Sequence, residues 1–122
     1  MQVKEIFNIY IDTDIELNIS NYLDYFYYAS QDERQTSINE EPHNNKDISC
    51  ENYAYVAAMV EKLCTDFSLQ YPQWIFKDNY FLSDPWFPAR IKGRARIYLM
   101  LYSPIEFLRR NLYVSENVLA RV

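Results

Sequence analysis

The stretch ISCENYAYVAAMVEKLCTDFSL, residues 48–69, decides the fold of this chain. Its large apolar residues recur every three or four positions and therefore line one face of a helix. The members of this face are Val56, Met59, Val60, Leu63, Cys64 and Phe67. The alanines between them let a second helix approach closely. Asp47 or Ser49 is placed to cap the first turn. We expect this segment to be the central core helix.

Residues 3–28 favour two further helices, because their apolar residues keep helical spacing through the tyrosine-rich stretch 21–29. A strand competes with this interpretation, since apolar and polar residues alternate between Phe7 and Ile19. The helical spacing continues better downstream, and residues 12–14 (Asp-Thr-Asp) would break the first helix and cap the second. We therefore expect two helices before residue 29.

The polar segment that follows contains a helix start and a loop. Ser30 and Glu33 have the spacing of a capping box, in which each side chain bonds the backbone of the other residue. A short helix over residues 31–39 is expected to stop before Pro42, because the residue before a proline disfavours helical backbone. Residues 41–47 are then a solvated loop.

Helical spacing disappears after Pro72 and returns near residue 95. The intervening segment from Trp74 to Phe87 is rich in aromatic residues, and we expect an ordered loop packed against the helices, because exposure would create a large apolar patch. A helix over residues 95–102 follows. Ser103 to Glu106 has the spacing of a second capping box and would start a helix over residues 104–110.

These elements predict an all-α fold in one domain that spans residues 1–122, a bundle of five or six helices with an ordered aromatic-rich loop. A single glycine among 122 residues argues against a turn-rich β-sandwich and against a phosphate-binding glycine loop. No apolar run approaches the roughly 20 residues of a membrane span, and the first residues do not have the pattern of a secretory signal. We expect a cytoplasmic protein that does not bind membranes.

The residue types needed for common catalytic and metal sites are scarce. His43 is the single histidine and lies in the polar loop. Cys50 and Cys64 are separated by about 21 Å along one helix, too far to bridge, and are expected to be free, buried thiols. Asp12, Asp14 and Glu16 resemble a capping cluster more than a catalytic carboxylate pair. We expect no enzyme activity, no cofactor and no metal site.

Charge is divided unevenly along the chain. Residues 1–66 carry thirteen acidic and four basic side chains, whereas residues 67–122 carry four acidic and eight basic ones. Either the two halves neutralise each other within one fold, or two faces of opposite sign contact different partners or two copies of the chain. A homo-oligomer is thus one of the open possibilities.

Aromatic residues accompany the basic ones. A basic run from Arg90 to Arg96 lies beside Tyr98 and is of a kind that grips single-stranded nucleic acid, although pairing with the acidic half is the favoured interpretation. Tyr22, Tyr25, Tyr27 and Tyr28 point in several directions around one helix. They cannot all be core residues, which favours a binding or oligomer face.

Two segments of the chain resemble a group of small bacterial helical proteins. The first is NYLDYFYYASQDERQTSINEEP, residues 21–42, and the second combines Trp86-Phe87 with SPIEFLRRNLYVSENVLARV, residues 103–122. The resemblance covers about half of the sequence. Members of that group lie beside toxin genes, often of the nucleotidyltransferase type, so the resemblance implies an antitoxin-like role. Leu108 stands where the group has a first arginine, so a triple-arginine cluster is absent here.

These observations predict a non-enzymatic module that binds a partner protein, as an antitoxin neutralises its toxin. The residues expected to contact the partner are Trp74, Trp86, Phe87, Arg94, Arg96, Arg109 and Arg110. The aromatic residues would be anchors and the arginines would form charge-assisted bonds. One alternative is a nucleic-acid-binding module that uses the basic C-terminal half. Another is an acidic inhibitor that mimics nucleic acid.

Overall fold

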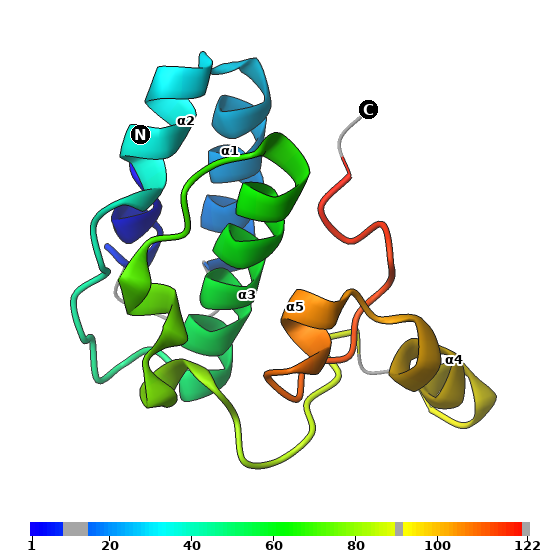
Figure 1. Cartoon of the computed structure of the whole chain (residues 1–122). Coiled ribbons are helices and arrows are strands. Elements are labelled where there is room, and N and C mark those ends of the chain that lie inside the picture. The colour runs from blue at the N-terminus through cyan, green and yellow to red at the C-terminus, as the bar shows by residue number, and fades with distance from the viewer. Residues whose placement is uncertain (9–14, 90–91, 121–122) are drawn as a thin grey trace.

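The computed structural model describes residues 1–8, 15–89 and 92–120, and within these residues it confirms the all-α fold (Figure 1). The α-helices are α1 (Ile15–Tyr28), α2 (Gln31–Ile38), α3 (Cys50–Phe67), α4 (Arg94–Tyr102) and α5 (Ile105–Leu108). The 3-10 helices are η1 (Val3–Phe7), η3 (Gln73–Phe76) and η4 (Asp78–Tyr80). Among the described residues the sole β pairing is an isolated parallel bridge between Trp86 and Leu112.

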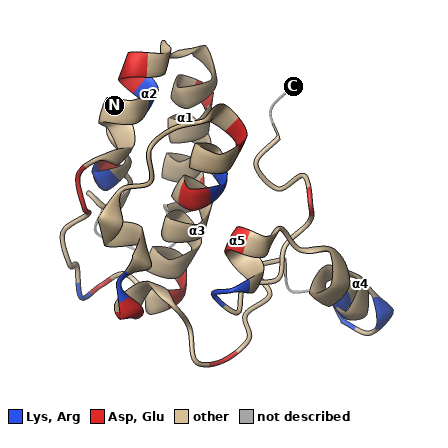
Figure 2. Cartoon of the chain, viewed as in Figure 1, with Lys and Arg blue, Asp and Glu red and all other residues tan. Residues whose placement is uncertain are grey.

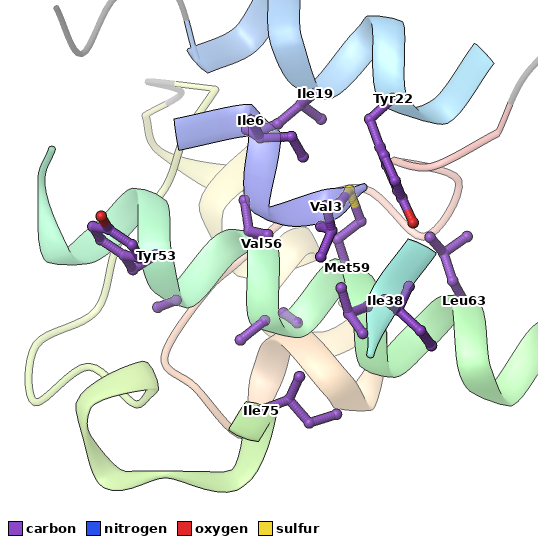
Figure 3. Packing of buried hydrophobic residues seen from close by; sticks show 14 of the residues in the cluster. Val3, Ile6, Ile19, Tyr22, Ile38, Tyr53, Val56, Met59, Leu63 and Ile75 are labelled. Atoms are coloured by element: carbon purple, nitrogen blue, oxygen red, sulfur yellow. The ribbon is translucent and has the colours of Figure 1, made fainter. Parts of the chain in front are cut away.

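Helix α3 is the centre of the core, as the sequence predicts. Figure 3 shows Val56, Met59 and Leu63 of α3 among apolar residues from η1, α1, α2 and η3. On the α1 side lie Ile19 and Tyr22, whose hydroxyl is 2.7 Å from the hydroxyl of the buried Ser37 in α2. One helix therefore contributes to a single core that residues of four other elements complete.

Local chemistry explains where the first helices begin. The Ser30 hydroxyl accepts a bond from Glu33 N and the Glu33 carboxylate accepts one from Ser30 N, so the capping box of α2 is confirmed. Ser49, rather than Asp47, caps α3 by accepting from Asn52 N at 3.3 Å. Helical backbone at residues 3–7 and 15–28 excludes the strand interpretation for those residues, whereas the predicted break at residues 12–14 lies outside the described ones.

The predicted aromatic loop is ordered and packed. Trp74 is buried, and its indole Nε1 donates to the carbonyl oxygen of Ile38 at 3.0 Å. Its ring meets Tyr80 edge-on, with ring centroids 5.3 Å apart. Tyr80 in turn donates to the carboxylate of Glu41 at 2.7 Å. The loop therefore closes the core beneath α3, and each buried polar group of its aromatic side chains has a partner.

A buried ion cluster attaches α5 to α3. The carboxylate of Glu61, which is 4% exposed, accepts from the guanidinium groups of Arg109 and Arg110. Arg110 is 0% exposed and also donates to the carbonyl oxygens of Ile75, at 2.7 Å, and Glu106, at 2.9 Å. One side chain thereby connects α3, η3 and α5.

The prediction of a second capping box at Ser103 and Glu106 is wrong. The Ser103 hydroxyl does not bond Glu106 but lies against the carbonyl oxygens of Leu99 and Val114 and accepts from Val114 N at 3.0 Å. Pro104 is the residue before α5 and makes no side-chain cap. As a result α5 spans only Ile105–Leu108, shorter than the expected 104–110, and residues 110–113 turn back to pair with the loop.

One further expectation needs correction. Cys50 and Cys64 are both free, as expected, but Cys50 is exposed and Cys64 alone is buried. The tyrosines of α1 are not all core residues, as expected: Tyr22 is buried, whereas Tyr27 is partly buried and donates to the carbonyl oxygen of Leu119 at 2.9 Å. Tyr28 is the exposed member of the group, at 93%.

Candidate protein interface

Helix α4 is apolar but largely exposed. It lies at the edge of the molecule beyond α5, away from α1 and α2 (Figure 1). Of its nine residues, all of which the structure describes, Leu99 is the buried one. The exposed large apolar residues are Ile97, Tyr98, Met100, Leu101 and Tyr102, with Ile105 of α5 beside them. Monomeric proteins rarely leave so many neighbouring apolar side chains in water, so this surface is a candidate interface.

Helical geometry shows which of these residues project furthest. Successive residues are about 100° apart around the axis, so Ile97 and Leu101, two positions on either side of Leu99, point away from the body. They are 59% and 70% exposed. Tyr98 and Tyr102 flank this ridge on one side and Met100 on the other. A helix that is apolar on nearly all sides is ordinarily an interior helix.

Both ends of α4 are held. Gly93 precedes the helix with φ 68° and ψ −137°, a backbone conformation that side chains disfavour, and its carbonyl accepts from Arg96 N at 3.0 Å. At the other end Ser103 N donates to Leu99 O at 2.9 Å. Tyr98 donates to the Glu116 carboxylate at 3.3 Å, and this neighbouring negative charge raises the pKa of Tyr98. The helix is therefore a positioned element of the fold.

A groove runs between α4 and the preceding loop. Its volume is about 530 Å³, and it is lined by Pro85, Trp86, Phe87, Lys92, Arg96 and Met100. The guanidinium of Arg96 lies 4.6 Å from the ring centre of Phe87. Phe87 stacks on Tyr113 with ring centroids 4.9 Å apart. The groove thus has an aromatic floor and a cationic edge, which suits apolar groups that carry a negative charge nearby.

The backbone of the C-terminal segment fixes the floor of this groove. Trp86 N donates to the carbonyl oxygen of Asn111 at 2.8 Å, and Tyr113 N donates to the carbonyl oxygen of Trp86 at 3.0 Å. The Asn111 side chain donates to the carbonyl oxygen of Leu82 at 2.8 Å. These bonds hold Trp86 and Phe87 half-buried at the surface beside α4.

The seven residues predicted to contact a partner separate into two sets. Trp86, Phe87 and Arg96 meet in the groove, and Arg94 lies exposed at the start of α4. The other three belong to the core or its edge. Trp74 and Arg110 are buried, so neither side chain can reach a partner while the fold is intact, and Arg109 bonds Glu61 although half of its side chain is exposed.

Sequence reasoning missed the apolar residues of α4 themselves. The signal was present in IYLMLY, residues 97–102, where six apolar or aromatic residues follow one another without a polar position. An ordinary surface helix would have polar residues on one side. The run indicates a helix with apolar residues on every side. The rest of the fold does not bury these residues.

The charges around this surface are predominantly positive. Lys92 and Arg94 are exposed, and neither forms a salt bridge within the part of the chain that the structure describes. Figure 2 shows basic residues at the start of α4 and acidic residues spread over α1, α2 and α3. The candidate interface and the helical body therefore present opposite charges.

A metal site or a membrane span would be another route to function for residues 1–8, 15–89 and 92–120. No group of three or more histidine, cysteine, aspartate or glutamate residues there has the arrangement of a metal site. No helix there has the length and apolarity to cross a bilayer. His43 lies exposed in the loop before α3. A scan of protein-family models and searches of curated proteins and solved structures find nothing that matches this chain.

Proposed function

We propose that this protein is a non-enzymatic binding module that restrains a partner protein by direct contact through α4 and the adjoining groove. The observation that carries this proposal is the exposed apolar ridge of α4 around Ile97 and Leu101. The groove adds half-buried aromatic side chains and a cationic edge, the residue types that supply most binding energy in protein interfaces.

The finer form of the proposal is an antitoxin that occupies a toxin enzyme in the bacterial cytoplasm. Its support is the resemblance of residues 21–42 and 103–122 to small proteins encoded beside toxin genes. The second of these segments contains α5 and residues 111–114, which fix the position of α4. Residues 103–122 therefore hold α4 in position, whereas the apolar ridge of α4 lies outside the segments that carry the resemblance.

The test is purification of the tagged protein from the organism that carries its gene, followed by co-expression with the neighbouring toxin gene. We expect a stable complex with one protein that survives nuclease treatment and high salt, and restored growth of cells that express the toxin. Absence of a stable protein partner together with absence of growth rescue contradicts the proposal.

A second candidate function is binding of single-stranded nucleic acid. It is favoured by one arrangement: Lys92 and Arg94 are exposed at the start of the helix that carries Tyr98 and Tyr102, whose ring centroids are 4.7 Å apart. This function requires affinity for oligonucleotides that falls steeply with salt concentration. Fluorescence anisotropy with labelled single strands at low salt decides the matter, since a flat titration eliminates it.

A further inference from the structure

We propose that α4 is an inserted recognition helix, which enters an apolar groove of the partner protein while carboxylates at the rim of that groove pair with Lys92 and Arg94. This inference rests on the proposed function and specifies the chemistry of the partner at the same surface. Insertion, rather than flat contact, follows from the distribution of apolar side chains around α4.

The exposed apolar side chains of α4 lie on more than one side of the helix. Ile97 and Leu101 point away from the body, Met100 faces the groove beside Phe87, and Tyr98 and Tyr102 lie on the opposite flank. A flat surface placed on the ridge would leave both flanks in water. A groove that receives the helix contacts the ridge and both flanks together, as in the helix-in-groove mode of recognition.

The exposed area is consistent with this mode. Six side chains are each about half exposed or more. Aromatic side chains bury about 150–250 Å² and aliphatic ones less, so the six together present less than roughly 600 Å². Stable complexes bury about 800 Å² on each partner. The helix alone is therefore too small, and the adjoining Pro85, Trp86 and Phe87 extend the apolar surface toward that size.

The charges at the start of α4 favour one kind of binding partner over the others. Helix α4 contains no acidic residue, and Lys92 and Arg94 have no salt bridge within the described residues. Pairing α4 with α4 of a second copy would bring the basic residues of both copies into one interface with no acidic residue of α4 to offset them. A partner groove with aspartate or glutamate at its rim neutralises these cations and gains charge-assisted bonds.

A membrane surface fits the same helix less well. A helix that lies on a bilayer keeps one face in water, but the apolar residues of α4 surround it. The body beside it is acidic, with thirteen acidic and four basic residues in residues 1–66, and is repelled by anionic lipid. Protein is therefore the occupant that both the apolar pattern and the charge pattern favour.

Site-specific crosslinking in the source organism tests this inference. One full-length variant carries the photoreactive p-benzoylphenylalanine at Leu101, and a matched variant carries it at Tyr28, which is as open to solvent but lies on α1. We expect Leu101 to crosslink to one protein, at apolar residues flanked by aspartate or glutamate. The Tyr28 variant should not crosslink to that protein.

Affinity measurements with the identified partner then separate the contributions of the ridge and of the cations. Leu101→Asp should weaken binding by at least about 30-fold, the loss expected at an interface hot spot. Tyr28→Asp should leave binding unchanged. The double variant Lys92→Glu, Arg94→Glu should weaken binding by about tenfold at low salt and by less at high salt. All variants should keep the wild-type urea unfolding midpoint.

The outcomes distinguish this inference from the broader proposal. If wild-type protein retains no partner, the proposed function fails, and the inference with it. If a partner binds but Leu101→Asp has no effect, or the crosslinked site lacks carboxylates, the function stands and the insertion mode is overturned. Crosslinking of Leu101 to a second copy also overturns it. The inference is also overturned if the wild-type protein binds phosphatidylglycerol vesicles or oligonucleotides and Leu101→Asp abolishes that binding.

Discussion

At the scale of single residues, Arg110 has the largest fully buried side chain among the described residues. Burial lowers the pKa of its guanidinium, and the Glu61 carboxylate opposes that effect. The ring of Phe81 covers the group, 4.5 Å from the guanidinium carbon. A buried cation is tolerated here because a buried carboxylate and two carbonyl oxygens surround it.

Glu61→Gln tests this cluster. The amide keeps the shape of the carboxylate but removes its charge, so the buried Arg110 loses the carboxylate to which it donates. We expect the free energy of unfolding to fall by about 3–5 kcal/mol in urea titrations. The matched control is Asp66→Asn, which breaks the partly exposed pair with Lys62 and should cost less than about 1 kcal/mol. Equal losses in the two variants contradict a buried ion cluster.

The burial of Arg110 could not be predicted from neighbouring residues. In the sequence it is the second member of an Arg-Arg pair at the end of a short helix, a position that favours exposed cations. Its counterion, Glu61, is 49 residues earlier in the chain. The burial of Trp74 is equally hard to predict, because the sequence does not show that its indole reaches the carbonyl oxygen of Ile38.

At the scale of elements, α3 and α4 illustrate what periodicity can predict. Helix α3 has a regular apolar face and a capping serine, so its presence and its approximate bounds follow from the sequence. The burial of all residues from Val56 to Glu61 does not follow, because a single apolar face leaves the opposite side in water. Helix α4 has apolar residues nearly all round, so its presence is predictable but its orientation is not. The groove likewise depends on the pairing of residues 82–86 with residues 110–113, which no local pattern encodes.

Gly93→Ala tests the conformation that starts α4. No heavy atom beyond its neighbours lies within 4 Å of the added Cβ, so the change introduces backbone strain without a clash. A strain of about 1–2 kcal/mol at positive φ should raise amide exchange rates in α4 by roughly 5- to 30-fold. Hydrogen exchange resolved by residue measures this, with α3 as the internal reference. Unchanged amide exchange rates in α4 would show that a side chain at position 93 causes no backbone strain.

At the scale of the whole molecule, the uneven charge along the sequence is only partly neutralised by the fold. Lys77 pairs with Glu41 across the two halves, and Arg109 and Arg110 pair with Glu61. Lys92 and Arg94 form no salt bridge within the described residues. Neutralisation within one fold is therefore confirmed for these pairs, whereas contact of two oppositely charged faces with different partners or copies stays a prediction.

The core as a whole predicts sensitivity to high pH. Burial raises the pKa of Cys64 to about 12 and raises the pKa of Tyr22 and Tyr80 above the ordinary value of 10.0. As pH rises above 9.0, the ordinary value for a thiol, the unfolded chain releases these protons while the folded chain retains them. The free energy of unfolding should therefore fall as the pH rises above 9.

Urea unfolding at pH 7, 9 and 10.5 measures this dependence. Tyr22→Phe should lower stability at pH 7 by about 1 kcal/mol, through loss of the bond with Ser37, and should show a shallower decline above pH 10. Tyr28→Phe, at an exposed position, should keep the wild-type decline. A decline of the same slope in Tyr22→Phe and wild type would exclude the buried phenol as a cause.

The attachment of α4 also sets an order of events during synthesis. The chain before the helix is held at Trp86 by Asn111 and Tyr113, and the chain after it is held at Ser103 by Val114. Both attachments use residues 111–114, which leave the ribosome after α4 itself. A nascent chain that ends before Asn111 can fold α1, α2 and α3 but has nothing to hold α4 in place. A chain that ends before Asn111 should therefore lack a positioned α4, even where α1, α2 and α3 have folded.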